Sequence, residues 1–287
     1  MANIGATTAF YKVETSLTRA NNEVSKSMER LATGKANASA GDRSSYVAMA
    51  DTFRLDYVGT KAGLKGAAVV MGYLETGMRV LDAASGLLSK LQELAVLAGN
   101  DTNSTADNNA INNEGEAIAD EFDRLLTDAT YKGKSIFTAA AGDMAVSVGG
   151  RSAAMSFGIL EPVGVANYTA LYSAGASGGA GHLAQTLSNW HSSAGTGTAT
   201  AKIEALQGEL NTRRVQAGSQ YAALESAVSY TTDLTAQYEL GFNAVSDVNF
   251  SMETAHLAKN QILQQAATAM LAQANSGQQG LLQLIQG

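Results

Sequence analysis

The sequence predicts a mainly α-helical protein in which long antiparallel helices from the N- and C-terminal halves pair in a coiled-coil bundle. Apolar residues recur at helical spacing over long stretches near both ends, and only one proline, Pro162, interrupts 287 residues. Aromatic residues make up 6% of the chain, so small and aliphatic side chains must fill the interior and let helices approach closely. A small β-hairpin region and a short outer insert complete the expected fold.

The stretch from Glu253 to Asn275 carries the strongest helical signal. It contains no Pro or Gly, and Ala, Leu, Met, Gln and Lys fill most of it, so intrinsic propensity favours a helix. An apolar stripe with uncharged polar flanks suits packing against other helices, so this helix requires helical neighbours. The stripe consists of Ala255, Ile262, Ala266, Ala269 and Gln273, with Leu263, Met270 and Leu271 beside it.

A second amphipathic helix is expected from Phe10 to Leu31. Its apolar positions are spaced by four, three, four, four and three residues, as in a coiled-coil seam. An ordinary amphipathic helix shows the same periodicity, but a matching helix at the far end of the chain favours the seam. The seam positions are Val13, Leu17, Ala20, Val24, Met28 and Leu31. Gly34 fits a helix C-cap, and a polar connector follows to Arg43.

The longest predicted helix begins at Ser44 or Ser45 and extends to about Ala98. Unbroken, it would be about 80 Å long at the standard rise. Each of its glycines weakens an isolated helix by roughly 1 kcal/mol, so the helix depends on its neighbours. The spacing of Gly59 and Gly63 indicates close packing between helices in water, because neighbouring charged residues make lipid burial implausible.

A further helix is expected from about Ala106 to Ala129, capped by Ser104 or Asp107. Its predicted core face consists of Ile111, Ile118, Phe122 and Leu125. Its acidic residues resemble paired carboxylates for acid catalysis, but a solvated helix face explains them better because no apolar pocket adjoins them. These residues are Glu114, Glu116, Asp120, Glu121 and Asp123.

Shorter and weaker signals follow. Residues 144–148 and 154–159 alternate around a glycine-rich turn and predict a β-hairpin. Residues 163–200 are rich in Gly, Ala, Ser and Thr, without the ending of a phosphate-binding loop, and predict a surface loop with a short helix from Leu183 to Trp190. A helix from about Ala201 to Leu240 should end at Gly241, and Gly277 and Gly280 should end the C-terminal helix.

Composition excludes several classes of function. The net charge of -7 and the pI near 5.0 exclude a nucleic-acid partner, since no basic run exists to displace phosphate counterions. The absence of Cys excludes disulfides and thiolate chemistry. We expect no membrane insertion, because no apolar run of 18 residues occurs. Residues 1–6 lack the features of a secretory signal, which taken alone indicates a cytoplasmic protein.

Several blocks resemble one known family. Asn260 to Asn275, with the sequence NQILQQAATAMLAQAN, resembles the C-terminal signature of bacterial flagellins. Similar blocks elsewhere are Asp247–Phe250 and Glu253–Ala255 before that helix, Leu31–Lys35 with Ser39–Asp42, Leu91–Val96, and Tyr131–Phe137. The resemblance covers roughly residues 1–159 and 201–287.

The resemblance implies a structural subunit, not an enzyme, that polymerises into the helical filament of the bacterial flagellum used for motility. It implies an inner terminal coiled-coil domain (1–43 and 246–287), a helical core domain (44–160 and 201–245) and a short variable surface insert (161–200). It also implies an extracellular protein exported without a cleaved signal peptide. Its implied partners are copies of itself, an export chaperone, and hook-associated and cap proteins.

The terminal helices themselves favour a polymer. An isolated pair of such helices is marginal in water, so it should become ordered only when other subunits cover it. Contacts between different surfaces of identical subunits generate helical filaments. The residues expected to mediate this inner-core self-assembly are Val13, Leu17, Val24, Met28, Leu31, Ile262, Leu263, Ala266 and Met270.

Two kinds of surface site are further expectations. By resemblance, Leu88, Lys90, Leu94 and Glu114 match positions at which an animal Toll-like receptor contacts enteric flagellins. Lys90 replaces an arginine there, which weakens the match because lysine lacks a planar bidentate donor. Candidate O-glycosylation sites in and beside the insert are Ser188, Ser192, Ser193 and Thr196.

Two other functions compete with this interpretation. Some flagellins carry a zinc protease, but the histidines here, His182, His191 and His256, lack the spacing of a zinc site, so we expect no catalytic, cofactor or metal site. A hook–filament junction protein would share the terminal heptads and the lack of Cys. The C-terminal block favours the filament subunit over that alternative.

Overall fold

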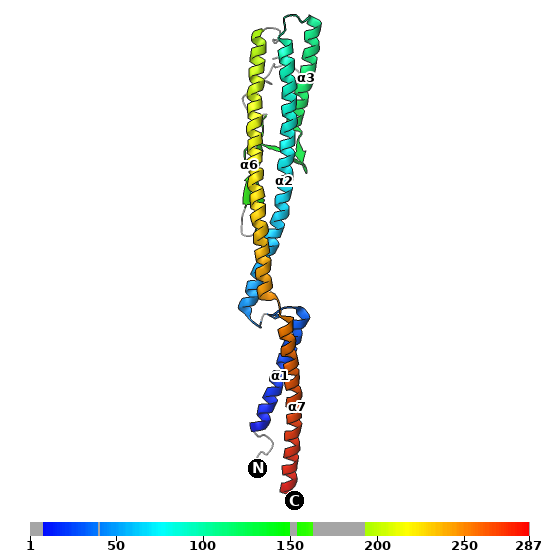
Figure 1. The fold of residues 1–287 in the computed structure, drawn as a ribbon, viewed down its shortest axis with the longest axis vertical. Coiled ribbons are helices and arrows are strands. Elements are labelled where there is room, and N and C mark those ends of the chain that lie inside the picture. Colours follow the sequence, from blue (N-terminus) through cyan, green and yellow to red (C-terminus); the bar gives the residue numbers. More distant parts are fainter. Residues whose placement is uncertain (1–7, 40, 150–153, 163–192, 287) are drawn as a thin grey trace. The chain divides into compact units, whose positions relative to one another are not determined.

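The computed structural model describes residues 8–39, 41–149, 154–162 and 193–286, and Figure 1 shows its elements. Contacts divide the chain into two compact units, one comprising Met1–Tyr57 with Ala236–Gly287 and the other Val58–Thr235. The division therefore falls within two long helices, whereas the sequence suggested boundaries near residues 43 and 246. Each unit is described below by itself.

The first unit is built on the pair of helices α1 (Thr8–Thr33) and α7 (Phe250–Gln286). They run antiparallel, in blue and in orange to red in Figure 1. Gly34 ends α1 with a φ of +70°, the left-handed conformation expected of a C-cap glycine. Its carbonyl accepts a hydrogen bond from the Val248 amide at 3.1 Å, and the Ala36 amide donates to the Ser246 carbonyl at 2.7 Å. These bonds fasten the end of α1 to the start of α7.

The second unit holds most of α2 (Ser44–Ala98), α3 (Thr105–Thr127) and most of α6 (Ser193–Ser246), which lie side by side in Figure 1. From Thr60 to Ala98, the buried positions of α2 recur at alternating spacings of four and three, which is a heptad seam. The largest fully buried side chains are Phe122, Leu74, Leu81, Leu88, Leu91, Leu126, Ile136, Ile159 and Leu206. The core therefore lies between these three helices and the β region.

Helix α3 begins at a capping box. The Ser104 hydroxyl accepts a hydrogen bond from the Asp107 amide, and the Asp107 carboxylate accepts one from the Ser104 amide at 2.9 Å. Ser104 is thus the N-cap, with Asp107 as its partner in the first turn. The buried face is that of Ile111, Gly115, Ala119, Phe122 and Leu126. The expected core residues Ile118 and Leu125 are only half-buried, because the stripe runs one position further along the helix.

Short strands pack against α2. Strands β4 (Met144–Ser147) and β5 (Ala154–Phe157) form the expected antiparallel hairpin. Strands β1 (Thr130–Tyr131) and β2 (Lys134–Ser135) pair antiparallel, and β3 (Phe137–Thr138) pairs in parallel with β6 (Ile159–Leu160). A Cβ added at Gly63 would lie 2.6 Å from the Val148 backbone, and one at Gly77 would lie 3.0 Å from Ile136. The β region therefore packs closely against α2 at these glycines, where a side chain would block it. The expectation that Gly63 serves helix-on-helix packing was wrong.

Two helices run through their predicted ends. Helix α6 continues past Gly241 to Ser246, and α7 continues past Gly277 and Gly280 to Gln286. At Gly241 the reason is packing, because the Phe53 ring lies 3.0 to 3.3 Å from where a Cβ would stand. The glycine there brings α6 close to α2 and does not end the helix. The short helix expected at residues 183–190 lies outside the described residues.

Candidate self-assembly surface

Helices α1 and α7 contact each other through heptad rows. On α1 the row of covered positions consists of Val13, Leu17, Ala20, Val24, Ser27 and Leu31. On α7 the row consists of Glu253, Leu257, Asn260, Gln264, Ala267, Leu271 and Ala274. Both rows advance by alternating steps of four and three residues, as an antiparallel coiled coil requires. The α7 row includes polar side chains, which apolar periodicity alone would not have selected.

Three large apolar side chains of α7 lie outside the row that contacts α1. Ile262, Leu263 and Met270 are 65%, 49% and 60% exposed, and Ala266 is also exposed. The row that contacts α1 runs through Ala267 instead, so the expectation that these residues mediate self-assembly stays a prediction. On α1, Met28 is likewise exposed, and Ser27 occupies the seam position that was expected for it.

A groove of about 490 Å³ runs between the two helices. One side of the groove is apolar and is lined by Leu263, Ala266 and Met270 of α7. Its remaining lining residues are Lys12, Val13, Ser16, Arg19, Ala20, Glu23, Asn260 and Ala267. The α1 wall therefore has charged rims around a small apolar floor. Such a groove matches the side of another amphipathic helix.

Polar contacts fix how the two helices pair. The Gln264 amide donates to the Asn21 amide oxygen at 2.7 Å, joining the outer edges of both helices. The Arg30 guanidinium lies 3.9 Å from the Asp42 carboxylate and 3.8 Å from that of Glu253. The carboxylate-bearing side chains are only 9% and 12% exposed, so Arg30 neutralises two largely covered charges at the junction of α1, the connector and α7.

The receptor positions expected by resemblance fall into two groups. Leu88 and Leu94 are 2% and 7% exposed and belong to the core, so receptor contact at these two positions stays a prediction that their burial disfavours. Lys90 and Glu114 are exposed and remain a prediction. Of the candidate glycosylation sites, Ser188 and Ser192 lie outside the described residues, whereas Ser193 and Thr196 lie at the start of α6.

The described part of the chain was searched for metal sites and for membrane-spanning helices. No group of three or more His, Asp or Glu side chains there is arranged to hold a metal ion. His256 lies exposed on α7, and the other two histidines lie outside the described ranges. No helix among those described is long and apolar enough to cross a membrane.

Family models match both ends of the sequence. The model of the bacterial flagellin N-terminal helical region matches residues 5–141, and that of the C-terminal helical region matches residues 200–285. The chain belongs to the bacterial flagellin family. It is accordingly a structural protein and a filament subunit of the bacterial flagellum, which places it in an extracellular assembly of copies of itself.

Known flagellins resemble the chain over most of its length. A 30.7 kDa flagellar filament core protein of Treponema maltophilum is 25% identical over 92% of this chain and 93% of its own. A flagellin of Halalkalibacterium halodurans is 25% identical over 92% of each chain. The crystal structure of Bacillus cereus flagellin aligns with a TM-score of 0.47 and 20% identity over 58% of this chain and 88% of that one.

Proposed function

We propose that the exposed face of α7, together with the groove beside it, is the surface through which copies of this flagellin pack in the inner layer of the filament. The observation that carries the proposal is the orientation of α7. It turns Asn260 and Gln264 toward its own α1 and leaves Ile262, Leu263 and Met270 uncovered. A helix with only one packing partner would turn its apolar side chains toward that partner and its polar side chains toward water.

The energetics favour further packing. Fully burying a Leu, Ile or Met side chain contributes about 1.5–3 kcal/mol. Covering Ile262, Leu263 and Met270 in each subunit therefore contributes several kcal/mol toward assembly, before the cost of association. Val13, Leu17, Val24 and Leu31 already cover α7 from the other side, whereas exposed Met28 is free for a neighbouring copy. Assembly and ordering of the terminal helices are then one process.

The proposal extends to export and early partners. As the family resemblance implies, the chain would leave the cell through the flagellum's own channel without a cleaved signal peptide. Before export, a chaperone would cover the same face of α7, and hook-associated and cap proteins would meet it at the filament ends. The mass of filament protein measures cleavage directly. A mass lower by a segment of 15 to 30 residues would contradict uncleaved export.

Polymerisation of the purified full chain tests the surface. Leu263→Gln with Met270→Gln replaces two groove residues by polar side chains of similar length and helix propensity. Negative-stain microscopy should show long tubular polymers for the original chain and a large loss of polymer for the variant. Ala272→Gln is the matched control, because Ala272 is exposed on α7, does not line the groove and lies nearly opposite Leu263 and Met270 around the helix.

Two outcomes would contradict the proposal. Normal filaments from the double variant would exclude this face of α7 from the assembly contacts. Discrete rings or particles from the original chain would favour a junction protein over a filament subunit. Circular dichroism of each monomer reports whether the substitutions disturb the helices that are ordered before assembly, and equal spectra exclude a folding defect in that part of the chain.

A further inference from the structure

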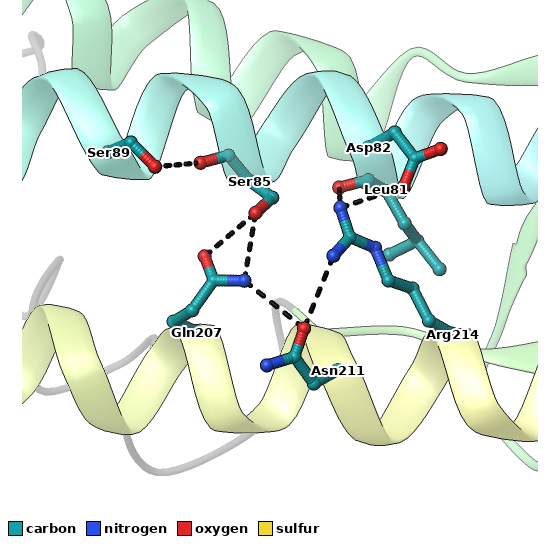
Figure 2. A network of polar contacts seen from close by, with 7 residues as sticks. All are labelled: Leu81, Asp82, Ser85, Ser89, Gln207, Asn211 and Arg214. Atoms are coloured by element: carbon teal, nitrogen blue, oxygen red, sulfur yellow. Dashed lines mark hydrogen bonds and ion pairs between the residues drawn. The ribbon is translucent and has the colours of Figure 1, made fainter.

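Five polar side chains join α2 to α6 near the middle of the second unit, and we call them the α2–α6 polar network (Figure 2). They are Asp82, Ser85, Gln207, Asn211 and Arg214. The Arg214 guanidinium contacts the Asp82 carboxylate at 2.8 Å and donates to the Leu81 carbonyl at 3.3 Å and to Asn211 Oδ1 at 3.2 Å. One arginine therefore bonds to both helices.

Gln207 completes the network from the other end. Its Nε2 donates to Ser85 Oγ at 2.8 Å and to Asn211 Oδ1 at 3.2 Å, while Ser85 Oγ lies 3.0 Å from Gln207 Oε1. Gln207, Asn211 and Arg214 stand at successive turns on one side of α6. The chain of contacts is thus continuous over two turns of helix, as Figure 2 shows.

The apolar seam beside the network does not define a single axial alignment. Its buried residues on α6 repeat with heptad spacing and are Ala199, Ile203, Leu206, Leu210, Ala217 and Leu224. Sliding α6 by one heptad, about 10 Å at the standard rise, again sets mostly small or aliphatic residues against the α2 seam. Within the second unit, hydrophobic burial alone would tolerate such a slip.

The network tolerates a slip in neither direction. One slip brings Thr200, Glu204 and Gln207 to the heights of Gln207, Asn211 and Arg214, so Asp82 loses its guanidinium and gains a carboxylate one turn away. The opposite slip brings Arg214, Gly218 and Tyr221 to those heights, where Gly218 offers no side-chain acceptor. Either alternative separates every pair of side chains that now bonds across the two helices in the network.

We infer that the α2–α6 polar network sets the axial register of α6 against α2. Polar groups within helix pairs are the best attested means of choosing one register among several of similar apolar packing. The half-exposed network contributes little to overall stability, since Arg214 and Asp82 are 30% and 69% exposed as side chains. The network therefore selects one register and adds little stability. A filament of identical subunits needs this selection, because every copy must have the same register.

A second tie must be removed for a clean test. Gln216 Nε2 reaches the Gly158 carbonyl only at 3.5 Å, the outer limit of a hydrogen bond. Gln220 on α6, by contrast, bonds firmly to Gly158 in the β region, and that region packs against α2 through Gly63. This tie alone could hold the register after the network is lost. Every variant in the test therefore carries Gln220→Leu, which removes this contact and places an apolar residue at a heptad position of the α6 seam.

The chain contains no Cys, so two introduced cysteines can carry spin labels without interference. Glu93 on α2 and Thr212 on α6 are exposed and stand at different heights, so an axial slip changes their separation. In the labelled full chain, Gln220→Leu should retain the original distance. Adding Gln207→Leu and Arg214→Leu should produce a second population of distances, as expected when α6 is displaced along α2 by about 10 Å.

A charge exchange supplies the matched control. In the Gln207→Leu, Gln220→Leu background, Arg214→Asp combined with Asp82→Arg restores an ion pair of opposite polarity and should restore the single original distance. A single unshifted distance in the triple Leu variant, with helicity retained by circular dichroism, would overturn the inference. Should the triple variant lose helicity, Arg214→Asp alone in the same background gives the deciding measurement, since the inference requires a shifted or broadened distance there too.

Discussion

The side-chain amide of Gln220 pairs with both backbone groups of Gly158. The Gly158 amide donates to Gln220 Oε1 at 3.0 Å, and Gln220 Nε2 donates to the Gly158 carbonyl at 3.1 Å. The side chain thus imitates a neighbouring strand and satisfies backbone groups where β5 ends and β6 begins. It occupies a heptad position of α6, where an apolar residue would fill the seam but leave these groups without that partner.

Replacing Gly158 by alanine should destabilise the protein by about 1–3 kcal/mol. The φ of +147° is one that side-chain-bearing residues rarely adopt, and the new Cβ would lie 3.0 Å from Thr138 Oγ1. Urea unfolding of the monomer measures the change. Gly208→Ala is the control, since its Cβ meets nothing within 4 Å on α6 and should raise stability by about 0.5–1 kcal/mol. Equal effects of the two changes would contradict this account.

Gly63→Ala should also destabilise the monomer, by about 1–3 kcal/mol, through overpacking. Its Cβ would stand 2.6 Å from the carbonyl carbon and oxygen of Val148, and a backbone group cannot rotate away as a side-chain end can. Gly86→Ala on the same helix meets nothing within 4 Å and should be stabilising. Urea midpoints that move in the same direction for both variants would show that helix propensity, and not contact with β4, governs Gly63.

Periodicity predicted the helices well because long amphipathic stretches repeat the same signal many times. Helix α1 spans Thr8–Thr33 against an expected 10–31, and α2 spans the expected Ser44–Ala98. The helix ends at Gly241 and Gly277 were wrong because a glycine costs only about 1 kcal/mol, which flanking helical turns and packing can offset. Which neighbour a glycine faces, as at Gly63 with β4, depends on contacts that no local pattern contains.

The candidate surface was harder to predict than the helices. The sequence identified Ile262, Leu263 and Met270 as packing residues, but it did not show that the chain's own α1 contacts a different face of α7. Apolar spacing selects the most hydrophobic face, whereas α7 meets α1 through Asn260, Gln264 and the small Ala267. A helix with two packing faces cannot reveal from polarity which one its own chain covers.

Acid should weaken the start of α3 through its capping box. Hydrogen bonds from the Ser104 side chain, and then from its backbone, hold the pKa of Asp107 below its ordinary value of 3.8. The stabilisation is therefore present above the unfolded pKa and is lost as pH falls through the folded one. Asp107→Asn should be less stable than the original chain at pH 7, and the difference should shrink below about pH 3.8. Thermal melts followed by circular dichroism measure both values.

Ser104→Ala tests the origin of that effect. Without the Ser104 hydroxyl, Asp107 loses its largest source of stabilisation, so adding Asp107→Asn should change the melting temperature less than it does in the original chain. An unchanged effect of Asp107→Asn in the Ser104→Ala background would assign the pH dependence to the helix dipole or to another group.

Alkali should weaken the contact between α2 and the β region at Tyr73. This residue is 4% exposed, packs edge-on against the rings of Tyr131 and Phe157, and donates its hydroxyl to the carbonyls of Ser135 and Ile136. Burial raises the pKa of Tyr73 to about 12 from 10.0. The folded state therefore holds this proton more tightly, so the stabilisation is complete below pH 10 and is lost as pH rises toward 12.

Tyr73→Phe removes the titrating group and keeps the ring. At pH 7 the variant should be less stable by about 0.5–1.5 kcal/mol, because the hydrogen bonds to two backbone carbonyls are gone. Between pH 10 and 12 its urea midpoint should fall less steeply than that of the original chain, so the two stabilities converge. Tyr230→Phe is the control, since Tyr230 is 67% exposed and its loss should leave the alkaline slope unchanged. Parallel slopes for the original chain and Tyr73→Phe would show that the buried hydroxyl does not govern alkaline unfolding.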